Sequence, residues 1–444
     1  MSNLLNIVVV VLTFQAHVDY VRCQSEALVV TNLLSSGTYT NAQAQSRVTL
    51  SNFPNIESYS GYFKVSEPKN SHLFFWFFKS QGNFTADPVI LCLQGGPGLS
   101  SLLTLYLENG PLKLTENGDV EARAESWTQF ASVLYIDSPV RTGFSFGNEY
   151  SATNDVITQD LHEATKQFLR LFPELTSNEL YLWGESYGGT YVPALGKAIQ
   201  EANLVNPSQR INLCGMMIGN GLINLRYQTK ISDFLYSTGL ADTSLKTIIA
   251  AHENAIYESM ISENYQVATD NFMAIMGVVY PKLEYHSLYN FMQQFSPFYT
   301  LAAVQQEYLS SANMKNTLHV GNQTYIWGNG DVTSNLTDYA KPQSSSVEYL
   351  LNHIKVLIYS GQADIIIPYI STVNYLRTIN FDGAETYRSA GRQLWRLNND
   401  LAGYVRQVNR LTEVCVRNAG HNVPLDQPLA AFTMVKKFIN NEGF

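Results

Sequence analysis

The chain has 444 residues, of which 45% are hydrophobic and 15% are charged, and its formal net charge is −9. This length and composition predict a globular protein with one large core or two smaller ones. The acidic balance argues against nucleic acid as a partner. After the N-terminal region, no segment is long and apolar enough for a membrane-spanning helix, so we expect no stable membrane anchor.

The N-terminus carries a short apolar run, Ile7 to Leu12. Such a run is too short to span a bilayer but is typical of the core of a signal peptide, although no Lys or Arg precedes it here. We expect a signal peptide over residues 1–23, with cleavage between Ala16 and Ser25; the alternative is a buried N-terminal strand. A signal peptide predicts a secreted, lysosomal or endosomal protein.

The cysteines and certain asparagines are also relevant to the expected secretion of the chain. Besides Cys23, the cysteines lie inside apolar, strand-like runs, and we expect them to be buried free thiols: Cys92, Cys214 and Cys415. If the chain is secreted, its N-x-S/T sequons are candidate glycosylation sites on the surface: Asn83, Asn322 and Asn335.

Short apolar runs recur along the chain at wide spacing. They predict buried strands over residues 73–78, 89–93, 133–136, 180–183, 213–218, 356–359 and 414–416. Amphipathic segments lie between several of them, and Asp155 to Phe172 is the clearest helix because its apolar residues recur at helical spacing. Strands that alternate with helices predict an α/β fold, with a mostly parallel central sheet flanked by helices.

The alternation stops between residues 225 and 352. Thr243 to Tyr280 predicts one or two helices, and a polar segment covers residues 321–346. We interpret residues 225–352 as a helical cap inserted into a core of residues 24–224 and 353–444. The aromatic residues of the cap could line a substrate pocket, but we favour a role in the cap's own core for most of them: Phe291, Phe295, Phe298 and Tyr299.

The strongest chemical motif follows the strand at 180–183. Gly184 to Gly188 matches the G-x-S-x-G nucleophile elbow, a sharp strand-to-helix turn that exposes the serine hydroxyl, here Ser186, above the sheet. By itself, the pattern also fits a glycine-rich turn with a capping serine. The nucleophile hypothesis therefore depends on a histidine base and an orienting carboxylate elsewhere in the chain.

Two later loops supply these partners in the order typical of α/β-hydrolases. Asp364 comes shortly after the strand at 356–359, and His421 follows the strand that ends at Val416. Both positions lie just past the carboxyl end of a predicted strand, where open α/β sheets bind their ligands. Asp364 could instead cap a loop and His421 could lie on the surface, but three placements in the right order favour a catalytic triad with Ser186.

An oxyanion intermediate also needs two backbone N–H donors. One is expected from Tyr187, the residue after the nucleophile. The glycine-rich loop from Gln94 to Gly98 directly follows the strand at 89–93. Glycines let this loop approach the reacting carbonyl closely, so it is expected to supply the second donor.

Together these motifs resemble those of serine carboxypeptidases of the α/β-hydrolase superfamily, most of all their vitellogenic-carboxypeptidase-like branch. The resemblance runs from about Tyr59 to the C-terminus and is weakest in the insertion. It rests on LQGGPGLSS (93–101), YIDSPVRTGFSF (135–146), WGESYGGTYVP (183–193), IGNGLI (218–223), HVGNQTY (319–325), VLIYSGQADIIIP (356–368) and AGHNVPLDQP (419–428).

The resemblance implies an α/β-hydrolase fold and a serine-type enzyme that removes C-terminal residues from peptides or proteins through an acyl-enzyme. Ser186 would be the nucleophile, His421 the general base and acid, and Asp364 the orienting carboxylate. The N–H groups of Gly96 and Tyr187 would form the oxyanion hole. No cofactor or metal is expected, and the chain has no H-E-x-x-H zinc motif.

The resemblance further implies a site for the terminal carboxylate of the substrate, formed by Gln94, Gly95, Glu108 and Glu185. Two carboxyls held close cannot both ionise cheaply, so they would share a proton and bind a carboxylate best at acid pH. Taken without the family, Glu108 could equally be a solvated helix residue, and Glu185 could merely shape the turn.

Four positions depart from the family pattern. Gln94 stands where many relatives have Asn, Cys92 where they usually have Trp, and Leu99 where they have Cys or Gly. Arg141 replaces a glycine and is the most disruptive, because it enters a place where glycine can adopt a backbone conformation that Arg tolerates poorly.

Two other functions stay open on the same scaffold. One is acyl transfer, in which an alcohol replaces water; the other is a binding protein without activity, against which the intact triad argues. The preferred C-terminal side chain and the oligomeric state, with a homodimer as one option, are not determined by the sequence.

Overall fold

The computed structural model of the chain describes residues 26–35, 37, 39–282 and 287–444. The expected signal peptide and Cys23 lie outside the described residues. None of the helices in the described part is both long and apolar enough to cross a membrane.

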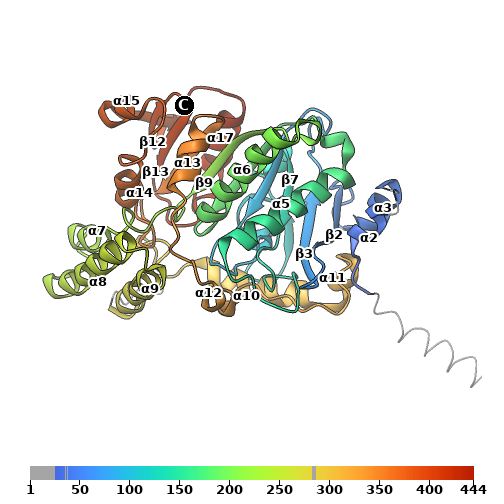
Figure 1. Ribbon diagram of the computed structural model, residues 1–444, viewed down its shortest axis with the longest axis horizontal. Coiled ribbons are helices and arrows are strands. Elements are labelled where there is room, and N and C mark those ends of the chain that lie inside the picture. The colour runs from blue at the N-terminus through green and yellow to red at the C-terminus, as the bar shows by residue number, and fades with distance from the viewer. Residues whose placement is uncertain (1–25, 36, 38, 283–286) are drawn as a thin grey trace, which may run out of the picture.

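An 11-stranded sheet forms the centre of the molecule (Figure 1). Its strands, in spatial order, are β1 (Arg47–Val48), β2 (Ser58–Ser66), β3 (Ser71–Phe78), β7 (Ser132–Ile136), β4 (Val89–Leu93), β8 (Leu180–Glu185), β9 (Leu213–Gly219), β10 (Lys355–Gly361), β13 (Leu411–Val416), β12 (Asp400–Val408) and β11 (Gln393–Leu397). The strands from β7 to β13 in this order run parallel. The strands at both ends pair antiparallel. Every strand predicted from an apolar run is present.

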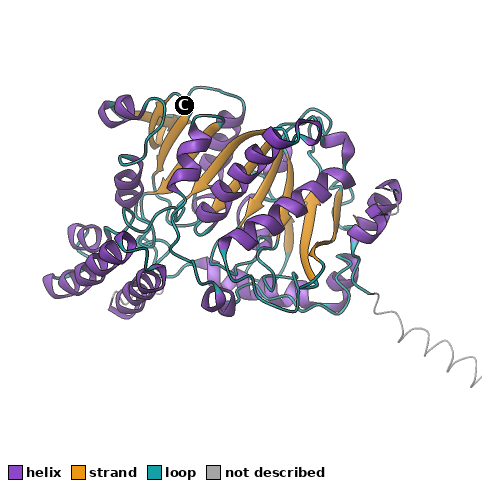
Figure 2. Cartoon of the chain, in the orientation of Figure 1, coloured by secondary structure: helices purple, strands orange, loops and turns teal. Residues whose placement is uncertain are grey.

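The apolar runs are continuous because the parallel strands are covered on both faces. In β8, Leu180 and Leu182 pack into one core, whereas Tyr181 and Trp183 pack into a second core on the opposite face. The predicted helix is α5 (Asn154–Leu171), which lies with α6 (Gly188–Val205) over the first face (Figures 1 and 2). The last helix, α17 (Pro428–Ile439), packs on the second face, where Phe438 meets Tyr181.

The predicted insertion is helical. The segment expected to form one or two helices forms α8 (Thr243–Ile261) and α9 (Tyr265–Lys282), which pack together and, with α7 (Ile231–Ser237), project from one end of the molecule (Figure 1). Further helices are α10 (Pro297–Ser310), α11 (Ala312–Thr317), α12 (Gly330–Asn335) and α13 (Ser344–Leu351). Of these, α13 packs against α6 and β10. The division of the chain at residues 225 and 352 stays a prediction.

The chain also has smaller elements. They include α2 (Val30–Ser35), α3 (Tyr39–Ser46), α4 (Leu102–Thr104), α14 (Tyr369–Leu376), α15 (Ala384–Ser389), α16 (Val423–Asp426) and a separate hairpin of β5 (Leu112–Leu114) and β6 (Val120–Ala122). Cys92 and Cys415 are buried free thiols as expected, whereas Cys214 is free but only partly buried.

The aromatic residues of the insertion divide into two groups. Phe298 is fully buried and stacks on Tyr289 with ring centroids 5.0 Å apart, and the partly buried Phe291 contacts Phe234. Phe295 and Tyr299 are 62% and 44% exposed. Phe298 belongs to the core on the second face of the sheet, and Phe291 packs against the core on the first face. The expectation that most of the four form a core of the cap's own is therefore not met.

Candidate active site

The turn between β8 and α6 carries Ser186. Its φ of 58° is in the left-handed region, and its backbone N–H donates to the carbonyl of Gly219 at 3.1 Å. A Cβ on Gly184 would lie 2.6 Å from the carbonyl oxygen of Gly188, and one on Gly189 would lie 2.8 Å from Cα of Gly221. Glycine is therefore required on both sides of the serine, and the structure has the sharp turn that the motif predicts.

Asp364 and His421 meet at the carboxyl ends of β10 and β13. Both side chains are buried, with His421 only 2% exposed, and Nδ1 of His421 lies 2.9 Å from Oδ2 of Asp364. A carboxylate accepts hydrogen bonds, so Nδ1 carries the proton of the neutral ring and Nε2 is left as the basic nitrogen. Asp364 also accepts hydrogen bonds from Nδ2 of Asn220 at 2.7 Å and from the N–H of Ile366 at 2.8 Å.

Ser186 is tied to this pair through its neighbours in the chain. Asn422, next to His421, donates from Nδ2 to Glu185, which precedes Ser186. Gly219, which accepts from Ser186, precedes Asn220, which donates to Asp364. These bonds bring the ends of β8, β9, β10 and β13 together, so the predicted triad residues share one edge of the sheet.

Residues 288–293, here called the strap, cross the loops of Asp364 and His421. The carbonyl of Tyr289 accepts from the N–H of His421, and the N–H of Phe291 donates to Ala363 at 3.0 Å. The Tyr289 and His421 rings lie nearly perpendicular, with centroids 5.2 Å apart. Backbone and ring contacts together fix the position of the histidine.

Asp426 fastens the strap to the histidine loop. Its Oδ2 accepts from the N–H of Gly420 at 2.7 Å and from Nδ2 of Asn290 at 2.8 Å, while Oδ1 accepts from Gln293 at 3.2 Å. A Cβ on Gly420 would lie 2.0 Å from the carbonyl oxygen of Tyr289, so the strap can approach only a glycine here.

The glycine-rich loop lies directly against the elbow. A Cβ on Gly95 would lie 2.5 Å from the backbone nitrogen of Tyr187, and Gly96 has a φ of 104° that favours glycine. Within the described residues, the N–H groups of Gly96 and Tyr187 donate to no protein acceptor. Both predicted oxyanion donors therefore have N–H groups free to meet a substrate.

A buried carboxyl anchors this loop from behind. Asp137 accepts hydrogen bonds from Oγ of Ser100 at 2.6 Å, from the N–H of Ser101 at 3.0 Å and from the N–H of Phe144 at 2.9 Å. Burial raises its pKa to about 6. A Cβ on Gly143 would lie 1.9 Å from Oδ2 of Asp137, so this contact also needs a glycine.

Beside the elbow, two glutamates form a buried pair. Glu185 ends β8, and Glu108 lies in the π-helical turn Leu105–Asn109; both are buried, and their carboxyls interact electrostatically. Nε2 of Gln94 donates to each carboxyl at 3.3 Å, and its Oε1 accepts from the N–H of Gly95 at 2.8 Å. The predicted carboxylate-binding residues thus lie together, and the alternative of a solvated Glu108 is wrong.

Burial is the main influence on the charge of this pair. It raises the pKa of Glu108 to about 7 and that of Glu185 well above its ordinary value, the latter raised further by the charge of Glu108. Hydrogen bonds from Gln94 and Asn422 and the positive charge of Arg123 act in the opposite direction. The pair therefore keeps a proton on the acid side of neutrality.

Arg141 adopts the backbone conformation that its glycine counterpart would tolerate better, with a φ of 71°. Its guanidinium donates to the carbonyl of Asn148 at 3.1 Å and lies over the ring of Tyr150 at 4.6 Å. The strain expected at this position is present, and the added cation is engaged by a neighbouring loop.

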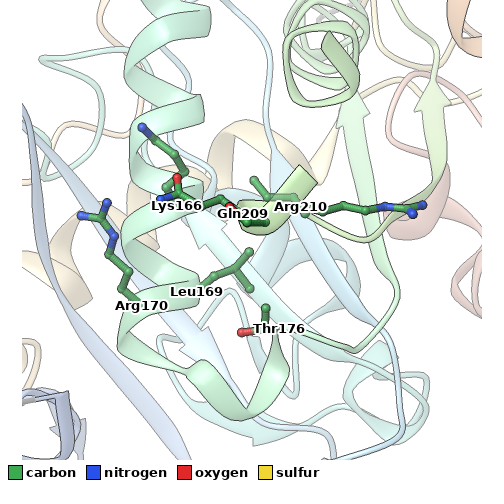
Figure 3. Close-up of a pocket in the computed structure, with 8 residues that line it drawn as sticks. Lys166, Leu169, Arg170, Thr176, Gln209 and Arg210 are labelled. Atoms are coloured by element: carbon green, nitrogen blue, oxygen red, sulfur yellow. The ribbon is translucent and has the colours of Figure 1, made fainter. Parts of the chain in front are cut away.

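A separate hollow of about 280 Å³ lies at the opposite, amino-terminal ends of β8 and β9. It is lined by Lys166, Leu169, Arg170, Thr176 and residues 208–211. In Figure 3, the charged end of Arg210 extends to the side opposite to those of Lys166 and Arg170. Because no residue of the predicted triad lines this hollow, it does not compete with the elbow as the site of chemistry.

A family model described as serine carboxypeptidase matches residues 49–441. The chain belongs to the serine carboxypeptidase family. Venom serine carboxypeptidase from Apis mellifera is 38% identical to this carboxypeptidase over 429 residues, covering 94% of this chain and 91% of that protein. Vitellogenic carboxypeptidase from Aedes aegypti is 35% identical over 428 residues, covering 93% and 90%. The predicted resemblance to this branch is confirmed.

The fold of this carboxypeptidase matches a solved relative. The crystal structure of a prohormone-processing carboxypeptidase from Saccharomyces cerevisiae superposes with a TM-score of 0.81, at 22% identity, and covers 90% of this chain and 96% of that one. The predicted α/β-hydrolase fold is confirmed.

Sequence reasoning missed Asn220, Asn422 and Asp426. A signal for the first was present, because Asn220 comes just past a strand end, as Asp364 and His421 do. Asn422 and Asp426 lie within a motif that was recognised, but the pattern does not say which groups their side chains contact.

Proposed function

We propose that this carboxypeptidase releases the C-terminal residue of peptides through an acyl-enzyme on Ser186. Oγ of Ser186 attacks the carbonyl carbon of the last peptide bond while Nε2 of His421 takes the hydroxyl proton. The histidine then passes that proton to the leaving amine, and water, activated by the same nitrogen, hydrolyses the ester. The hydrogen bond between His421 and Asp364, at 2.9 Å beside the elbow, is the observation that carries this proposal.

Asp364 holds the imidazole in the required tautomer and stabilises the imidazolium that forms. The N–H groups of Gly96 and Tyr187 stabilise the oxyanion, since charge develops on the carbonyl oxygen only during the reaction. The absence of a protein acceptor for either N–H among the described residues supports this role.

The buried glutamate pair supports an exopeptidase, as opposed to a general hydrolase. Oε2 of Glu108 and Oε2 of Glu185 accept no hydrogen bond from another donor group of the described chain. A proton held there can be donated to the terminal carboxylate of a substrate. As the pH rises and both glutamates ionise, they repel that carboxylate, so we expect the best substrate binding at acid pH.

The test compares N-blocked dipeptides with free and amidated C-termini between about pH 4 and 7. Wild type is expected to release the terminal residue from the free acid with a higher kcat/KM than from the amide, and Ser186→Ala is expected to release neither. Activity that survives in Ser186→Ala contradicts the nucleophile, and equal rates on both substrates contradict the carboxylate site. An acceptor alcohol added to the same assay detects acyl transfer through a blocked product.

We also propose that the protein follows the secretory route to an extracellular or lysosomal site. A relative named for venom supports this, and so does the exposure of all the candidate glycosylation sites: Asn83, Asn322 and Asn335. Expression in eukaryotic cells, followed by glycosidase digestion of wild type and of each Asn→Gln variant, tests it. Retention of the unglycosylated protein inside the cell contradicts the route.

A further inference from the structure

Asn422, the residue directly after the catalytic histidine, lies against the glutamate pair. Its side chain is 3% exposed, and its Nδ2 donates to Oε1 of Glu108 at 3.2 Å and to Oε1 of Glu185. Nε2 of Gln94 donates to the same two oxygens. Each Oε1 therefore lies between two amide groups, one from the glycine-rich loop and one from the histidine loop.

This arrangement separates the two oxygens of each carboxyl. The Oε1 atoms receive the amide hydrogens, whereas the Oε2 atoms are buried without another donor group from the described residues. Oδ1 of Asn422 is likewise buried without a partner in the described part of the chain. The orientation of Asn422 is thus set by the two carboxyls, toward which an amide can donate only through its nitrogen.

Other titratable groups face the pair from every side. The cationic or basic groups are Arg123, which follows β6, and His421, which follows β13. The remaining groups are a thiol and phenols from β4, β7, β10 and the strap, all with pKa values raised by burial: Cys92, Tyr135, Tyr359 and Tyr289. Because these groups stay neutral at acid and neutral pH, the glutamate pair is the acid of this cluster that titrates there.

We infer that Asn422 is a positioning residue of the carboxylate-binding site, one that holds the shared proton on the Oε2 atoms and joins this site to the catalytic histidine. The inference deepens the proposed function and rests on it. A substrate carboxylate that binds the glutamate pair contacts carboxyls that are hydrogen-bonded to Asn422. Asn422 is in turn the neighbour of His421 in the chain. Recognition of the free C-terminus and placement of the general base therefore share one loop.

The test measures kcat and KM against pH for Asn422→Leu, on a free-acid dipeptide and its amide. Removing Nδ2 removes a donor to the ionised carboxyls, so the pair ionises at higher pH. We expect the alkaline limb of kcat/KM for the free acid to move up by about one pH unit. The ratio of kcat/KM for the free acid to that for the amide is expected to fall about tenfold at acid pH, mainly through KM. Gln94→Leu, which removes the matching amide, is expected to move the limb in the same direction.

The possible results separate the two levels of the argument. If wild type treats free acid and amide alike, the carboxylate site itself is wrong. If wild type discriminates but Asn422→Leu keeps both its ratio and its alkaline limb, the role of Asn422 is wrong while the site stands. An equal loss on both substrates without a shift of the limb also overturns it, since that is the result of general misfolding. Labelling of Ser186 by a fluorophosphonate reports folding, and Asn422→Ser, whose shorter side chain lacks Nδ2, replaces the leucine variant if that variant fails to fold.

Discussion

Nδ2 of Asn220 lies 2.7 Å from Oδ2 of Asp364, the same oxygen that accepts the hydrogen bond from His421. Oδ1 of Asn220 accepts from the N–H of Gly361 at 3.1 Å, and its own N–H donates to Tyr359 at 2.8 Å. Asn220 thus joins the end of β9 to the loop after β10. Its φ of 44° is a left-handed conformation that Asn tolerates better than most residues.

Asn220→Ala is expected to lower kcat by about 10- to 100-fold with little change in KM, because a hydrogen bond to a charged group is lost and the carboxylate is no longer held in position. The measurement is steady-state kinetics with the rate of fluorophosphonate labelling. Asn418→Ala is the matched control, since Asn418 is exposed and also left-handed, with a φ of 56°. If the two variants lose the same activity, the bond to Asp364 is unimportant.

Substitutions of Arg141 test its strained backbone and its side-chain contacts separately. Arg141→Ala and Arg141→Gly both remove the contact with Tyr150, but only glycine relieves the φ of 71°. We expect the glycine variant to be more stable than the alanine variant by about 1 kcal/mol in urea unfolding. Both should keep kcat/KM within a few-fold of wild type, because the guanidinium binds the Asn148 loop. A more stable alanine variant would contradict the strain.

Predictability from sequence followed the physical environment of each residue. The parallel strands were found because burial on both faces makes them continuous apolar runs. Towards the ends of the sheet, β11 and β12 were missed because they are partly exposed, and the largely buried β2 was missed because serines and a glycine interrupt its apolar residues. Ser186, Asp364 and His421 were found because strand ends place them. The sequence around Glu108 contains no motif that indicates a functional residue, because its role depends on its place beside Glu185 in the folded chain. Glu108 was therefore found only through the resemblance to the family.

Contacts between segments that are distant in the chain could not be predicted from the sequence. Asn290 and Asp426 are 136 residues apart, and nothing in the periodicity of either segment indicates that they meet. The strap could be recognised only after the fold had brought the insertion across the catalytic loops.

The strap provides a prediction of its own. Asp426→Ala removes the acceptor of Gly420, Asn290 and Gln293 and leaves buried donors without partners. We expect a loss of about 2 kcal/mol in stability and a fall of about tenfold in kcat as His421 loses its support. Gln293→Ala, which removes only the longest of the three bonds, should lose much less of both. If Asp426→Ala is less stable but fully active, the strap serves the fold and not the histidine.

The buried carboxyls predict how stability varies with pH. Burial raises the pKa of Glu108 to about 7 and those of Asp137 and Asp160 to about 6. Each therefore has a higher pKa in the folded chain than in the unfolded chain. The folded chain therefore binds more protons than the unfolded chain. The contribution of these carboxyls to the free energy of unfolding is complete below about pH 4 and is lost as the pH rises through 6 to 7. For Glu108, the loss amounts to at most about 3 kcal/mol.

Three histidines that are buried or partly buried act in the opposite direction, because desolvation lowers their pKa and the unfolded chain takes up their protons first: His72, His162 and His319. A comparison of variants cancels this contribution. We expect Glu108→Gln to melt several degrees above wild type at pH 7.5, where the glutamate pair is forced to ionise, and close to wild type at pH 5, where the pair holds its proton. Glu116→Gln makes the same substitution at an exposed position and should shift the melting temperature equally at both pH values. Calorimetry at pH 5 and pH 7.5 measures these shifts in melting temperature. If Glu108→Gln shifts the melting temperature equally at the two pH values, the carboxyl of Glu108 does not carry the proton on which substrate recognition depends.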